Sequence, residues 1–204
     1  MLDGGSANYK EVVTGLTVDT GASAIVRGSG TSILTVGTLT RSNQGGTIDF
    51  GADSIVETTT ANQSTLSILG GYATVGRTGW AANVSNSVKA ITNYLPAWAA
   101  TNNTSVSTAS ASGSGLTGSL RFEGGVSSAL TLSGAATITS GGILFAQAAG
   151  VVDATISGST LTSGNGKDLI VHQFNEFGQL IINSQITGAI SLTKSGLGKL
   201  VVTG

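Results

Sequence analysis

Residues 155–204 read TISGSTLTSGNGKDLIVHQFNEFGQLIINSQITGAISLTKSGLGKLVVTG, and this stretch decides the fold. Short runs of β-branched residues return about every ten positions, a spacing typical of successive strands. Branched side chains pack well on a pleated surface, whereas the Gly, Ser and Asn that follow each run suit tight corners. The stretch therefore predicts strand, corner and strand in repetition, as in a solenoid.

The same rhythm extends over residues 12–50 and 116–154. Apolar residues alternate there with Thr, Ser and charged residues, which indicates strands with one buried and one wet face. Short strands without long crossovers are compatible with a sandwich, a barrel or a parallel β-helix. The breaks are single Gly or Ser-Gly corners rather than the Asn-Gly or Asp-Gly loops of hairpins. This favours parallel stacking of coils, each coil being one solenoid turn of about 20–25 residues.

Composition narrows the class of protein further. The 204 residues include 31 Gly, one Pro and no Cys, and only 9% are charged, against about 25% in ordinary globular domains. Regular apolar runs argue against disorder, the alternative for a chain rich in Gly and Ser. The net charge of −1 is evenly spread, so no basic stripe predicts a nucleic-acid partner. The missing cysteines exclude disulfide and thiolate chemistry.

Both tryptophans and two of the three tyrosines lie in one window, residues 70–115, where the strand pattern changes. We predict a single β-solenoid domain over residues 1–204, with N-terminal coils at 1–69, an irregular lateral excursion at 70–115 and C-terminal coils at 116–204. Within the excursion, residues 99–115 have the composition of a polar loop. Its aromatic side chains are the candidate binding residues, since such rings stack on sugars or anchor partner proteins; the alternative is a small satellite core. They are Tyr72, Trp80, Tyr94 and Trp98.

The remaining candidates for chemistry have simpler interpretations. Asp49, Asp53 and Glu57 are the only clustered acids, and we expect a solvated face there rather than an acid/base pair. His172 is the sole histidine and is expected at a surface or corner, since one His builds neither a zinc site nor a triad. Residues 164–168, GNGKD, match part of a calcium-binding nonapeptide repeat, but no second copy follows. We therefore predict a corner there, with no catalytic residue, metal or cofactor.

One phrase of the sequence carries a family resemblance. Residues 192–204 read LTKSGLGKLVVTG, which resembles the autotransporter-associated β-strand repeat. Residues 9–28 (YKEVVTGLTVDTGASAIVRG) and 70–81 (GGYATVGRTGWA) are similar to coils that precede this repeat. The resemblance implies a right-handed parallel β-helix in an exported bacterial surface protein, often the passenger of an outer-membrane translocator. The first residues lack the features of a signal peptide, so we expect an internal or processed piece that meets the translocator only through regions outside it.

The expected function follows from this resemblance and from the strand edges of a solenoid. We expect a structural or adhesive segment, secreted or at the bacterial surface, that acts as a spacer or fibre module and is not an enzyme. Its expected partners are neighbouring coils of the same or an identical chain stacked end to end, and a surface glycan or a host or cell-surface protein. The alternative function is a carbohydrate-binding or polysaccharide-degrading β-helix.

Overall fold

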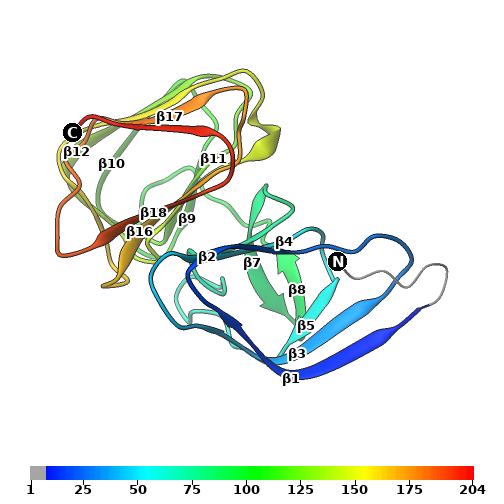
Figure 1. The fold of residues 1–204 in the computed structure, drawn as a ribbon. Coiled ribbons are helices and arrows are strands. Elements are labelled where there is room, and N and C mark those ends of the chain that lie inside the picture. The colour runs from blue at the N-terminus through cyan, green and yellow to red at the C-terminus, as the bar shows by residue number, and fades with distance from the viewer. Residues whose placement is uncertain (1–7) are drawn as a thin grey trace. The chain divides into compact units, whose positions relative to one another are not determined.

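The computed structural model describes residues 8–204, which are built almost entirely of β-strands (Figure 1). The chain divides into two compact units, residues 1–92 and 93–204, each with its own core. Parallel sheets dominate both units, and in each unit they form a β-solenoid. The predicted fold class is thereby confirmed.

The first unit begins with two parallel stacks of strands (Figure 1). One stack has the order β1-β3-β5 and the other β2-β4-β6, so each pass of the chain adds one strand to each stack. The strands are β1 (Lys10–Val18), β2 (Gly21–Ile25), β3 (Ile33–Arg41), β4 (Gly46–Phe50), β5 (Val56–Thr58) and β6 (Ala73–Val75).

An antiparallel hairpin then joins the two stacks. Strands β7 (Gly79–Val84) and β8 (Ser87–Ala90) pair with each other, while β8 also pairs with β5 and β7 with β6. Ser85 and Asn86 form the connecting turn, and both have positive φ, 51° and 68°. Two positive φ values in a two-residue loop define a type I′ turn, which matches the twist of the paired strands. The hairpin covers the free edges of β5 and β6 and ends the parallel stacking of this unit.

The second unit repeats the parallel arrangement with two stacks of its own. One sheet has the order β10-β12-β14-β17-β19 with β15 also on β12, and the other has the order β18-β16-β13-β11-β9. A single turn of 3-10 helix, Gln147–Ala149, follows β13. The strands are β9 (Asn103–Val106), β10 (Ser110–Thr117), β11 (Ser119–Phe122), β12 (Ser128–Ile138), β13 (Gly142–Phe145), β14 (Ala154–Gly158), β15 (Leu161–Ser163), β16 (Asp168–Gln173), β17 (Gln179–Ile182), β18 (Ser191–Ser195) and β19 (Lys199–Val202).

The register gives the length of each coil. In the first unit Lys10 lies beside Ile33, an offset of 23 residues. In the second unit the offsets run from 16 residues, Asn103 to Ser119, to 28 residues, Gly142 to Ile170. The predicted coil of about 20–25 residues falls inside this range.

Residues 70–115 contain β6 to β9 and most of β10. The stretch 91–102 lies between β8 and β9. The prediction of a polar loop over 99–115 is wrong, because β9 and β10 occupy most of it. The Ser and Gly residues of β10 form a strand because the register with β12 supplies its hydrogen-bond partners.

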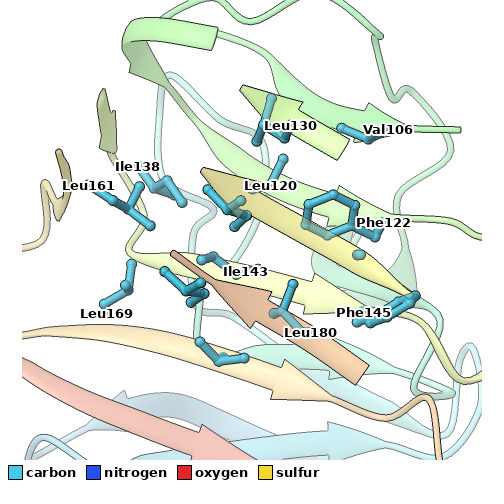
Figure 2. Packing of buried hydrophobic residues seen from close by; sticks show 14 of the residues in the cluster. Val106, Leu120, Phe122, Leu130, Ile138, Ile143, Phe145, Leu161, Leu169 and Leu180 are labelled. Atoms are coloured by element: carbon cyan, nitrogen blue, oxygen red, sulfur yellow. The ribbon is translucent and has the colours of Figure 1, made fainter. Parts of the chain in front are cut away.

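Apolar side chains of successive coils fill the interior of the second unit (Figure 2). Leu120 lies beside Ile143, and Phe122 beside Phe145, so equal positions of neighbouring coils stack on one another. The centroids of the two phenylalanine rings are 6.0 Å apart at a tilt of 60°, a favoured geometry for aromatic pairs. Nearest-neighbour coil contacts of this kind supply most of the stability of a solenoid.

The corner after β18 explains the glycines of the LTKSGLGKL phrase. Gly196 has φ 82°, and a Cβ on it would overlap the carbonyl oxygen of Gln173 in the preceding coil. A Cβ on Gly198 would overlap the carbonyl oxygen of Asn175, while the Gly198 amide donates to the Gln173 carbonyl at 3.0 Å. Leu197, between the two glycines, is 82% exposed. The motif is therefore a corner that fits closely against the coil before it.

Candidate functional site

The four candidate aromatic residues do not form one cluster. Tyr72 and Trp80 belong to the first unit, whereas Tyr94 and Trp98 belong to the second. Trp80 lies on β7 and is completely buried, so its indole cannot stack on a ligand while the hairpin is closed. The binding role assigned to the four rings stays a prediction, and their surroundings differ.

Tyr72 and Tyr94 each contact an arginine. The Arg41 guanidinium carbon lies 5.7 Å from the centre of the Tyr72 ring, and that of Arg121 lies 4.3 Å from the Tyr94 ring. Burial raises the pKa of the Tyr72 hydroxyl, although the Arg41 charge opposes the shift. Arg121 also pairs with Glu123 at 3.3 Å. Cation–π contacts of this kind fix both rings within their own units.

Trp98 is the candidate residue that lines a groove. The groove has a volume of about 470 Å³ and follows β10, the edge strand of its sheet. Pro96 and Trp98 supply large apolar side chains to its lining, and several other lining residues carry hydroxyl groups. The other lining residues are Ala97, Thr108, Ser110, Ala111, Ser112, Gly113, Ser114 and Ser133, and none of them is charged.

Short-range contacts hold the Trp98 loop in place. The carbonyl oxygen of Ala97 accepts hydrogen bonds from Asn102 Nδ2 at 2.9 Å and from Thr104 Oγ1 at 3.1 Å. Trp98 Nε1 donates to the carbonyl oxygen of Gly115 at 3.4 Å. The indole lies so close to Gly113 that a Cβ there would be 2.6 Å from the ring. Glycine at position 113 therefore allows the ring to lie close against β10.

The sequence also contained a signal for the hydroxyl groups of this groove. Residues 110–114 alternate as Ser-Ala-Ser-Gly-Ser, which places the three serines on one face of a strand. The composition of this segment suggested a loop, so the serines were missed as candidate binding residues. The alternation was the signal that could have found them.

The clustered acids serve structural roles in the first unit. Asp49 is buried on β4 and accepts hydrogen bonds from Thr74 Oγ1 at 2.8 Å and from the amide of Arg77 at 2.9 Å. Burial raises the pKa of the Asp49 carboxyl, although these two donors oppose the shift. Glu57 instead pairs with Lys10 at 2.7 Å, which lowers its pKa. The expectation of a solvated acidic face is wrong for Asp49, because its carboxylate holds the turn between β6 and β7.

His172 is fully buried on β16, so the expectation of a surface or corner histidine is wrong. Its Nδ1 lies 2.9 Å from Ser195 Oγ, and Asp168 Oδ2 accepts a hydrogen bond from Thr193 Oγ1 at 2.5 Å. Four residues of extended strand, about 13 Å, separate Asp168 from His172. The Ser and His are therefore adjacent, but the Asp is too far away to complete a triad. Both polar pairs link β16 to β18 of the next coil.

The GNGKD segment forms a corner before β16. Asn165 Oδ1 accepts hydrogen bonds from the amides of Lys167 and Asp168, at 2.8 and 3.0 Å. Asn165 Nδ2 donates to the carbonyl oxygen of Ser140 in the preceding coil at 3.2 Å. The asparagine thus closes its own turn and ties it to the coil beside it.

Residues 8–204 contain no group of three or more His, Cys, Asp or Glu side chains placed to hold a metal ion. None of the helical segments among them has the length and apolar character needed to cross a membrane.

The fold defines the class of protein as a β-solenoid, and one comparison refines this. The chain is 33% identical to the adhesin BmaC autotransporter of Brucella suis biovar 1 (strain 1330), over an alignment of 223 residues that covers 98% of the chain. The chain spans only 6% of the length of that relative. No family model matches the chain, and no solved structure matches it. The resemblance to autotransporter passengers is thereby confirmed.

Proposed function

We propose that this chain is an adhesive, non-enzymatic β-solenoid segment of an exported bacterial surface protein. The observation that carries the proposal is the similarity of nearly the whole chain to part of an autotransporter adhesin. A stack of coils is also a suitable spacer, because each coil adds about 4.8 Å of length and needs only its neighbours for stability. The segment thereby holds binding surfaces away from the cell.

The grooves support a binding role over a polysaccharide-degrading one. Cleavage of a glycosidic bond needs two carboxyl groups on either side of the substrate, about 5–10 Å apart. Neither the Trp98 groove nor the groove formed by 26–30 and 51–52 is lined by an Asp or Glu.

Beads that carry the purified chain are expected to attach to cultured epithelial cells several-fold more often than beads that carry the heat-denatured chain. The comparison isolates the folded surface, because composition and charge are identical in both. Flow cytometry of bead-positive cells gives the readout. Equal attachment of both bead types would contradict an adhesive role for this segment.

We further propose that the end coils associate with other coils, either of a second copy or of a longer chain. Strand β1 lies at the edge of its sheet, and Val12 is 69% exposed on it. Strands β18 and β19 lie at the edges of the two sheets of the second unit. Unpaired strand edges present free backbone amides and carbonyls to any strand that meets them.

The mass of the isolated chain should therefore rise with concentration in size-exclusion chromatography with light scattering. Val12→Lys should hold the chain monomeric, because an edge lysine opposes pairing with another strand. Val151→Lys is the matched control, since Val151 is 84% exposed at a corner rather than on a strand, and this variant should associate as the unaltered chain does. A monomer at every concentration would refute end-to-end association.

A further inference from the structure

We infer that the Trp98 groove is a binding site for a neutral saccharide. The inference rests on the proposed adhesive function and names the chemical class that this segment recognises. Three features of the groove carry it: its aromatic wall, its hydroxyl groups and the absence of charge from its lining.

The aromatic wall suits the face of a sugar ring. Trp98 is half-buried, with its ring against Gly113 and its Nε1 directed to the Gly115 carbonyl. The indole can present an electron-rich surface to the groove, and such surfaces attract the slightly positive C–H groups of a pyranose. Pro96 precedes the ring and restricts the backbone, so little conformational entropy is lost when a ligand binds.

Other residues of the lining carry hydrogen-bonding groups that suit sugar hydroxyls. Ser110, Ser112 and Ser114 come from alternate positions of β10, and Thr108 and Ser133 also line the groove. Each hydroxyl both donates and accepts, as a sugar hydroxyl does. The strand holds these groups at fixed spacing, which a flexible loop would not do.

Size and charge restrict the ligand further. A volume of about 470 Å³ falls within the range of about 300–1,000 Å³ for small-ligand sites. No lysine or arginine lines the groove to neutralise a sulfate or a carboxylate, so a sialylated or sulfated sugar would lose its hydration without an ion pair. A neutral mono- or disaccharide unit fits this environment better than an acidic one.

Fluorescence of the two tryptophans of the chain gives a direct measure of sugar binding in the groove. Trp80 is completely buried, so acrylamide quenches mainly the fluorescence of Trp98. We expect one or more neutral sugars from a panel of glucose-, galactose-, mannose- and N-acetylglucosamine-terminated disaccharides to protect Trp98 saturably in the full 204-residue chain. Sialylated and sulfated versions of the same sugars should protect it at least tenfold less well.

Three variants distinguish an effect on sugar binding from an effect on the stability of the fold. Trp98→Ala should weaken binding of the best sugar in calorimetry, but Trp98 also contacts the core, so this variant could lose stability. Ser112→Leu places an apolar group among the hydroxyls and leaves Trp98 in place, and it should weaken binding about tenfold, or roughly 1.4 kcal/mol. Ser23→Leu, on exposed β2 of the other unit, is the matched control and should bind normally.

Three outcomes would overturn the inference. The first is no protection by any neutral sugar, and the second is unchanged affinity in a folded Ser112→Leu variant. The third is binding of extended peptides without sugars, which would assign the edge of β10 to strand addition. If the beads still attach to cells in the face of any of these results, the adhesive function is retained and its ligand is not a neutral saccharide in the Trp98 groove.

Discussion

Replacing Gly196 by Ala is expected to lower the free energy of unfolding of the second unit by about 2–5 kcal/mol. A left-handed backbone conformation costs an alanine about 1–2 kcal/mol, and Gly196 has φ 82°. The new Cβ would also overlap the carbonyl oxygen of Gln173, and overpacking of this kind costs about 1–3 kcal/mol. Urea unfolding followed by circular dichroism measures the change.

Neighbouring positions of the same corner provide the control. Leu197→Ser should change stability by no more than about 0.5 kcal/mol, the usual range for surface substitutions, because Leu197 is 82% exposed. Gly198→Ala should resemble Gly196→Ala, since its Cβ would overlap the Asn175 carbonyl. Equal stability of Gly196→Ala and Leu197→Ser would show that the corner does not fit against the preceding coil as described.

The coil architecture was predictable because its signals are local. Each strand alternates within a few residues, and each corner needs a residue that tolerates a close approach or a positive φ. The phrase at 192–204 combines both signals, and the structure places β18, the two-glycine corner and β19 on it. A repeated local pattern needs only parallel stacking to become a solenoid.

The hairpin that ends the first unit was missed because its pairing is antiparallel and occurs once. Its turn residues, Ser85 and Asn86, lack the Asn-Gly or Asp-Gly signal of a type I′ turn. Asparagine does tolerate the left-handed region, so Asn86 was a weak signal for it. Trp80 lies beside Thr74 of β6 in this hairpin and is buried, which the local sequence does not indicate.

The buried polar residues were missed for a related reason. Nothing near His172 in the sequence indicates that Ser195 will lie beside its ring, because the two residues come from consecutive coils. The same holds for Asp49 and Thr74. Polarity alone suggested exposure, whereas a partner in the next coil makes burial tolerable.

A disulfide introduced between register partners is expected to form almost completely. Ala129 on β12 lies beside Thr155 on β14, and Ile181 on β17 lies beside Thr155 on its other side. Neighbouring parallel strands are about 4.8 Å apart, within the Cα separation of about 4.4–6.8 Å that a disulfide spans. Equivalent residues on strands two coils apart, such as Ala129 and Ile181, are separated by about 9.6 Å, which is too far for a disulfide. Because the chain has no Cys of its own, any bond formed is the designed one.

The in-register stacking of parallel coils is the central claim, and oxidation of two double variants tests it most directly. Ala129→Cys with Thr155→Cys should cross-link under mild oxidation, as seen by mass spectrometry of the intact chain and its peptides, whereas Ala129→Cys with Ile181→Cys should keep free thiols. Cross-linking of the second pair in preference to the first, or of neither pair in a folded chain, would contradict the stacked coils on which the proposed function rests.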